Sequence, residues 1–235
     1  MIWLQHILIF VLVVVAPACD YYEFKKLKAS EDPRRKVRFY RKWLVLQWIF
    51  AGIVLVSAGR GLWHPPATSE WPWLHTDRAH SFALGLTLGI LAVMAVPLFS
   101  LGKPKVRATI RKAFAKLSFF VPCETFEFPW FAALSVTAGV CEEWVCRGFV
   151  LHYLVAAPWH LSLGTAVILS AAVFGLNHLY QGLSGMVTTG VLGLILALLY
   201  LATGSLLLPM VLHALIDLRA LALIIGARER EAEGQ

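Results

Sequence analysis

The sequence predicts an all-α fold, a polytopic bundle of about seven to eight transmembrane helices. Hydrophobic residues make up 59% of the 235 residues and charged residues only 15%, with a mean hydropathy of +0.70. Soluble domains are about half apolar and about a quarter charged. The charges are also unevenly placed, because the 69 residues between Arg147 and Asp217 contain no Asp, Glu, Lys or Arg. This pattern excludes a disordered chain and a nucleic-acid-binding domain, and it indicates the lipid bilayer as the surroundings.

Seven apolar runs approach the length of about 20 residues that a membrane-spanning helix needs. They are Ile2–Ala18, Trp43–Gly59, Ser81–Leu101, Phe128–Ala157, His160–His178, Leu183–Ala202 and Ser205–Gly226. The fourth run carries charges inside it and is long enough to be kinked or extended. An eighth helix fits Lys103–Val121, where apolar residues recur at helical spacing between basic ones. An interfacial amphipathic helix is the simpler interpretation of that stretch.

The distribution of Lys and Arg predicts the orientation of the bundle. Nine of the 21 basic residues lie in Asp20–Lys42 and six lie in Gly102–Glu127. Cytoplasmic loops carry an excess of Lys and Arg, so we expect both loops in the cytoplasm. The Arg60–His80 loop has two basic residues and three tryptophans, which is typical of an outer loop at the lipid headgroups. We therefore expect the N-terminus outside and the C-terminus in the cytoplasm.

The chain divides into three expected parts. Residues 1–127 supply N-terminal transmembrane helices with basic cytoplasmic loops. Residues 128–226 form the helix bundle that carries the chemistry, and residues 227–235 are a polar tail. Only the second part places Asp, Glu, Lys or Arg side chains inside apolar runs.

Six ionisable residues inside three of these runs are the candidate site. They are Glu142, Glu143 and Arg147 in the fourth run, His178 at the end of the fifth, and His213 and Asp217 in the seventh. A charged group within a span costs roughly 2.5–3.5 kcal/mol on insertion scales, and such groups mark functional sites by default. The alternative is that the acidic and basic groups of the fourth run only hold helices together.

The spacing of these residues predicts how they pair. Residues four positions apart share a helix face, so we expect Glu143 to pair with Arg147. For the same reason His213 is expected beside Asp217. Glu142 points about 100° away from Glu143 on a helix of 3.6 residues per turn, which leaves it free to face a cavity. A carboxylate kept ionised there is a suitable base toward water.

Three motifs on three of these helices resemble the signature of a known family. They are EExxxR from Glu142, FxxxH from Phe174 and HxxxD from His213. In this order they are similar to the signature of CPBP intramembrane proteases, the CAAX-processing and bacteriocin-processing proteins also called the Abi family. The resemblance covers roughly Phe128–Ala222 and implies a CAAX-endopeptidase-like core that hydrolyses peptide bonds. The first three runs show no motif of that family.

The resemblance also implies a role for each motif residue. Glu142 would activate the attacking water, with His178 assisting. Glu143 and Arg147 would complete and orient the first motif. His213 and the residue four positions after it would bind the oxyanion of the tetrahedral intermediate.

The last motif residue is Asp217, where the eukaryotic CAAX endopeptidases have Asn. An ionised Asp cannot donate a hydrogen bond to an oxyanion. Either Asp217 is protonated, or it orients His213 and leaves the donation to that ring. Bacterial relatives often have Asp at this position, so the resemblance implies a bacterial protein of the inner (plasma) membrane.

We expect metal-free glutamate chemistry with no cofactor. A zinc-dependent form of the same protease is the alternative, because two Glu and two His could ligate a metal, although no HExxH helix is present. The expected partners are the lipid bilayer and a peptide or protein substrate with a membrane-associated segment, with no nucleic acid. Leader peptides of secreted peptides and C-terminal membrane anchors are the expected substrates.

Three other classes of protein remain open at this stage. A proton- or ion-coupled transporter also uses membrane carboxylates and histidines, although no inverted repeat is visible. A catalytically silent scaffold or immunity protein would have lost a motif residue, and none is lost. A thiol transpeptidase could use Cys141 or Cys146, which flank the Glu pair.

Overall fold

The computed structural model describes residues 2–66, 69–115, 117–156 and 158–232, and within these ranges the chain forms helices and turns with no strand. The principal helices are α1 (Ile2–Phe10), α2 (Ala16–Ala29), α3 (Arg35–Ala58), α4 (Asp77–Phe99), α5 (Pro104–Ala115), α6 (Phe128–Glu143), α7 (Leu151–Val155), α8 (Leu163–Leu176), α9 (Gly182–Thr203) and α10 (Leu207–Ala232). Short 3₁₀ turns lie at Arg60–Trp63, Pro72–His75, Thr125–Glu127 and Leu179–Gln181. The fold class is therefore as predicted.

Two of the helices continue through π-helical turns. Val11–Val15 joins α1 to α2, and Trp144–Val150 joins α6 to α7. The fourth predicted run is thus one extended helix, interrupted by a π-helical segment that carries Arg147. Such segments are rare and often occur at functional sites.

Each of the seven predicted apolar runs coincides with a helix, and α5 forms within the predicted amphipathic stretch. Among the described residues, five helices are long and apolar enough to cross a membrane, namely Ile2–Ala29, Arg35–Ala58, Asp77–Phe99, Leu179–Thr203 and Leu207–Arg230. The fifth predicted run gives a shorter helix than expected, since α8 has 14 residues. At about 1.5 Å per residue it extends roughly 21 Å, less than the roughly 30 Å of a bilayer's apolar core.

The prediction of a loop over Asp20–Lys42 was wrong in its extent. Helix α2 continues to Ala29 and α3 begins at Arg35, so the connection is only the five residues 30–34. Hydropathy marks where a helix leaves the apolar layer, and a charged segment can remain helical beyond that point. Here ion pairs support the charged ends, with Glu23 lying 2.9 Å from Lys42 across the two helices.

The helices pack most closely beside the predicted site, where glycines remove side chains from the contact. A Cβ added to Gly139 would lie 2.7 Å from the backbone nitrogen of Ala214, so α6 and α10 touch through their backbones next to His213. A Cβ on Gly175 would lie 2.6 Å from the Met186 carbonyl oxygen, which shows the same close approach of α8 and α9. Small residues at helix contacts are typical of membrane proteins.

The N-terminal helices are fastened to the second half of the chain by buried polar contacts. The Lys36 ammonium on α3 donates a 2.8 Å hydrogen bond to the Val121 carbonyl and lies 3.5 Å from the Glu127 carboxylate. That carboxylate also accepts a 2.6 Å hydrogen bond from the backbone N–H of Cys123. One turn further along α3, the Tyr40 hydroxyl donates to the Phe120 carbonyl. These contacts fix the rotation of α3 against the start of α6.

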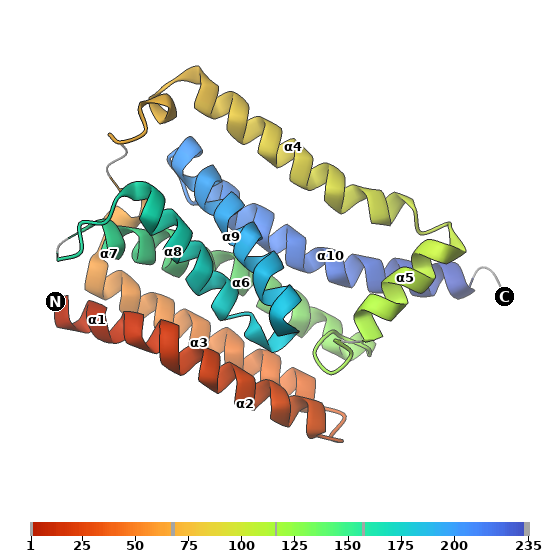
Figure 1. Ribbon diagram of the computed structural model, residues 1–235. Coiled ribbons are helices and arrows are strands. Elements are labelled where there is room, and N and C mark those ends of the chain that lie inside the picture. The colour runs from red at the N-terminus through yellow and green to blue at the C-terminus, as the bar shows by residue number, and fades with distance from the viewer. Residues whose placement is uncertain (1, 67–68, 116, 157, 233–235) are drawn as a thin grey trace.

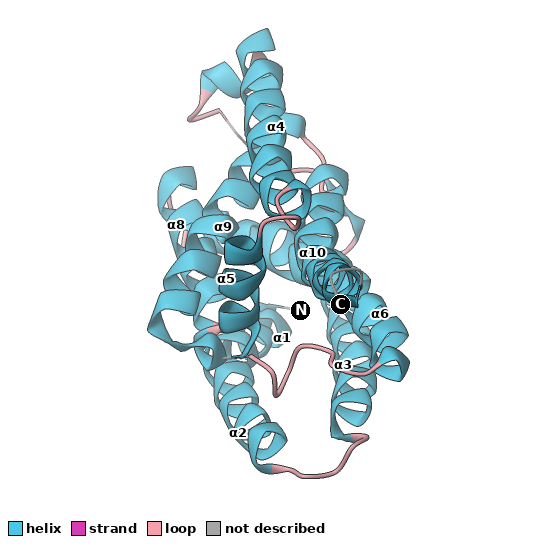
Figure 2. Cartoon of the chain, turned by 90° about the vertical axis from the view of Figure 1, so that its right-hand side faces the viewer, coloured by secondary structure: helices cyan, strands magenta, loops and turns pink. Residues whose placement is uncertain are grey.

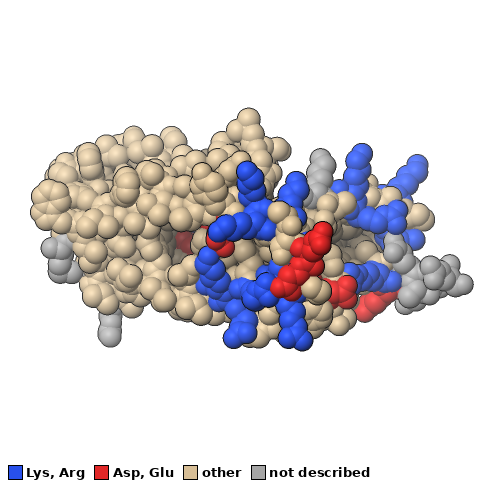
Figure 3. Space-filling model, turned by 90° about the horizontal axis from the view of Figure 1, so that it is seen from below, with Lys and Arg blue, Asp and Glu red and all other residues tan. Residues whose placement is uncertain are grey.

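The arrangement places the two termini at opposite ends of the bundle (Figure 1). Along the bundle, α8 and α9 form one side and α3, α6 and α10 the other, while α4 lies at the top of the view and packs against α9 and α10 (Figure 2). On one face of the molecule, Lys and Arg gather toward the end that holds the turn between α2 and α3. The opposite half of that face lacks them (Figure 3). This face is therefore polarised in charge along its length.

Candidate active site

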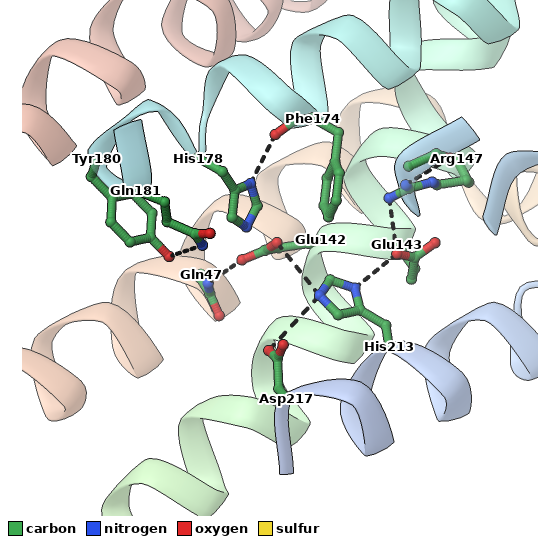
Figure 4. Close-up of polar contacts among 11 residues, drawn as sticks. Gln47, Glu142, Glu143, Arg147, Phe174, His178, Tyr180, Gln181, His213 and Asp217 are labelled. Atoms are coloured by element: carbon green, nitrogen blue, oxygen red, sulfur yellow. Dashed lines mark hydrogen bonds and ion pairs between the residues drawn. The ribbon is translucent and has the colours of Figure 1, made fainter. Parts of the chain in front are cut away.

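The six predicted site residues come together from three parts of the chain. They lie on α6 and the π-helical turn after it, in the turn that follows α8, and on α10 (Figure 4). Their sequence separation reaches 75 residues, from Glu142 to Asp217. Three separate helices therefore supply one cluster of ionisable side chains.

The predicted pair of Glu143 and Arg147 is formed and fully buried. Arg147 Nη1 donates to Glu143 Oε1 at 2.8 Å, and both residues are 0% exposed. The same carboxylate oxygen lies 2.8 Å from Nδ1 of His213, which is 3% exposed. A carboxylate accepts only, so Nδ1 of His213 carries the hydrogen and donates it. Glu143 thus orients the imidazole of α10 as well as the guanidinium of its own helix.

Phe174 packs at the centre of this network. The Arg147 guanidinium lies 4.3 Å from the centroid of its ring. The rings of His178 and His213 have their centroids 4.7 Å and 5.6 Å from that of Phe174. The FxxxH motif therefore contributes a packing ring together with the imidazole that the sequence singles out.

Arg147 is held on its other side by α9. Its Nη2 donates to the Gly193 carbonyl at 3.0 Å. A Cβ on Gly193 would lie 2.9 Å from Phe174 and 3.1 Å from Nη2 of Arg147. Glycine at this position therefore leaves room for the guanidinium, a requirement that helical spacing alone does not reveal.

Glu142 points away from the buried pair, as its position on the helix predicts. Its side chain is 26% exposed, and Oε2 lies 4.0 Å from Nε2 of His213. Its other oxygen, Oε1, accepts a 2.9 Å hydrogen bond from Nε2 of Gln47 on α3. The carboxylate is therefore accessible on one side and held on the other.

His178 lies just beyond the end of α8 and faces Glu142 (Figure 4). Its Nδ1 lies 2.8 Å from the Phe174 carbonyl oxygen. Because a carbonyl can only accept, Nδ1 carries the hydrogen, and Nε2 is left as an acceptor in the neutral ring. Helix α8 ends at Leu176, so His178 lies outside the helix and its ring turns toward the inside of the bundle.

Asp217 lies on the other side of His213. Its Oδ2 is 3.8 Å from Nε2, and its side chain is 38% exposed. The hydrogen bond that orients the imidazole goes to Glu143 instead, at 2.8 Å. The ring is thus surrounded by three carboxylates, two of them close to the nitrogen that faces the accessible part of the site.

Gln47 is not among the predicted site residues, because it is not ionisable and belongs to none of the three motifs. A signal was present, since Gln47 is the one residue of Trp43–Gly59 with an amide or ionisable side chain. An isolated amide within an apolar run is costly to bury without a hydrogen bond. That cost marks Gln47 as a residue with a partner inside the bundle.

Within the ranges that the structure describes, no group of three or more His, Cys, Asp and Glu side chains is placed so that it could hold a metal ion. Cys141 and Cys146, the residues of the thiol alternative, are free and buried.

The comparisons with known proteins agree with the motifs. Residues 124–219 match the family model described as Type II CAAX prenyl endopeptidase Rce1-like. No curated protein and no solved structure matches the chain. The matched segment contains all six predicted site residues. The match places residues 124–219 in the CPBP/CAAX protease family. Together with the apolar helices, it supports in general terms an integral membrane protein that is an intramembrane endopeptidase, a peptide hydrolase.

Proposed function

We propose that the protein hydrolyses peptide bonds of membrane-associated or secreted-peptide precursors with a water that Glu142 and His178 activate. One observation supports this most strongly. The accessible carboxylate of Glu142 faces two imidazoles, Nε2 of His213 on α10 at 4.0 Å and the ring of His178 in the turn after α8. Amide hydrolysis needs a polarised water and a preorganised oxyanion site, and this grouping can supply both.

In the first step the water would lie between Glu142 and Nε2 of His178. Glu142 takes one proton of the water as the water oxygen bonds to the carbonyl carbon of the substrate. The electron pair of the carbonyl moves to its oxygen, which becomes the oxyanion. In the second step the C–N bond breaks, and Glu142 returns the proton to the leaving nitrogen.

The oxyanion would be stabilised by His213. Nδ1 of this ring already donates to Glu143, so donation from Nε2 requires the doubly protonated imidazole. Its positive charge would be balanced by the carboxylates around it. In this scheme Asp217 contributes charge beside Nε2, and Arg147 keeps Glu143 in place.

We further propose that the protein lies in a bacterial inner membrane, with its N-terminus outside and its C-terminus in the cytoplasm. The termini lie at opposite ends of the bundle, and one end carries the basic residues, and both features support this orientation. The substrate would be a leader peptide of a secreted peptide or a C-terminal membrane anchor.

Purified protein incubated with membrane peptides is expected to cleave them in the presence of chelator, because the proposed chemistry uses no metal. Cleavage is measured by mass spectrometry of the products. The variants Cys141→Ser and Cys146→Ser should cleave at the wild-type rate. Loss of cleavage with chelator, restored by added zinc, would favour the zinc-dependent form. Loss in either cysteine variant at unchanged melting temperature would favour a thiol nucleophile.

The turn at residues 30–34 is expected to lie on the cytoplasmic side. Ser30→Cys, made in a Cys19→Ser background because Cys19 is exposed, should resist an impermeant thiol reagent in intact cells and react after lysis. The matched control is Ser69→Cys, an exposed residue of the predicted outer loop, which should react in intact cells. The reverse pattern would invert the proposed topology.

A further inference from the structure

We infer that Gln47, on α3 and outside the segment 124–219, is a positioning residue that holds the Glu142 carboxylate in the orientation needed to activate water. The inference rests on the proposed function, since it assigns Gln47 an effect through Glu142. It extends the active site to the N-terminal half of the chain, where neither the family match nor the motifs place any residue.

The first observation is the direction of the contact. Gln47 Nε2 donates to Glu142 Oε1 at 2.9 Å, and the amide approaches from the side opposite His213 (Figure 4). The other oxygen of Glu142, Oε2, faces Nε2 of His213 at 4.0 Å. Gln47 therefore occupies one carboxylate oxygen and leaves the other turned toward the imidazole.

The second observation is that the Gln47 amide has an unmet hydrogen-bonding group. Its Oε1 is buried and has no hydrogen-bond partner among the described residues. An ionised carboxylate can only accept, so the amide nitrogen must face Glu142 and the oxygen must turn away. A buried polar atom without a partner destabilises the folded state. An apolar side chain of the same size would avoid that cost, so folding alone does not explain an amide here.

The third observation is that other contacts of α3 fix where Gln47 points. Lys36 and Tyr40 bind backbone carbonyls of the segment before α6. Tyr40 is seven residues before Gln47 and so lies on the same face of the helix. Glu143, in contrast, is fixed by Arg147 and His213. Glu142 lies on the accessible side of the site and needs a hydrogen-bond donor of its own, which Gln47 on α3 supplies.

The test compares Gln47→Met with Trp48→Phe, each assayed for peptide cleavage and melting temperature. Methionine matches glutamine in length and cannot donate a hydrogen bond to Glu142. Trp48 donates at 3.3 Å to Thr137 in the same α3–α6 contact without touching Glu142, so Trp48→Phe is the matched control. Misplacing a reacting group can lower a rate about 100-fold.

For Gln47→Met we expect kcat to fall about 10- to 100-fold, with KM and melting temperature close to wild type. Trp48→Phe should keep the wild-type kcat. Wild-type kcat in Gln47→Met would overturn the inference, as would an equal loss in Trp48→Phe. Glu142→Gln is assayed in parallel. If it is inactive while Gln47→Met is fully active, only the inference fails. If it cleaves normally, the proposed function fails and the inference with it.

Discussion

Replacement of Glu142 by Gln is expected to lower kcat for peptide cleavage about 10²- to 10⁴-fold, the range that a general base contributes. The change is nearly isosteric and removes the carboxylate that would take the proton of the attacking water. The amide oxygen of Gln47 can accept a hydrogen bond from the new amide nitrogen, so α3 and α6 can still be joined by a hydrogen bond at this position. The rate is measured by quantifying cleaved peptide under saturating substrate.

The control for this variant is its melting temperature, which should match that of the wild type. Glu142 is partly exposed and lies outside the buried contact of Glu143 and Arg147, so its charge should matter little for folding. Normal cleavage by Glu142→Gln would remove Glu142 from the role of base. A transporter or a silent scaffold would show no cleavage in any variant, the wild type included.

Glu143→Ala is expected to lower the free energy of unfolding by roughly 3–5 kcal/mol, the usual cost of removing one partner of a buried ion pair. Arg147 is 0% exposed and would keep the Gly193 carbonyl and the Phe174 ring as neighbours, with no negative charge in contact. His213 would lose the acceptor of its Nδ1 hydrogen. The yield of folded protein and its melting temperature in detergent measure the effect.

The double variant Glu143→Ala with Arg147→Met separates charge from packing. It removes both partners, so part of the yield lost in the single variant should return. Activity should stay low in both, because His213 is no longer oriented. A single Glu143→Ala variant with wild-type yield and melting temperature would show that the pair does not stabilise the bundle.

Much of the fold could be predicted from the sequence, because hydropathy in a membrane protein reports directly which residues meet lipid. All seven apolar runs are helical, and α5 occupies the predicted amphipathic stretch. The ends of helices were less predictable. Helix α2 continues past Asp20 to Ala29, since charge sets how deep a residue lies and not whether its backbone is helical.

Contacts within one helix could also be predicted, as the pair of Glu143 and Arg147 shows. The contacts between helices could not. The hydrogen bond of His213 to Glu143 spans 70 residues, and that of Gln47 to Glu142 spans 95. Helical spacing carries no information on which faces meet. Helical spacing places His213 beside Asp217, whereas the hydrogen bond that orients the ring is made to Glu143.

The most direct measurement of the central claim is kcat for four proteins, the wild type, Glu142→Gln, His178→Ala and the double variant. If the two side chains activate one water together, each single variant loses most of the activity and the double variant is no slower than the slower single one, because residues that act as a unit are non-additive. If the losses multiply in the double variant, or if either single variant cleaves at the wild-type rate, joint activation of water by Glu142 and His178 is contradicted.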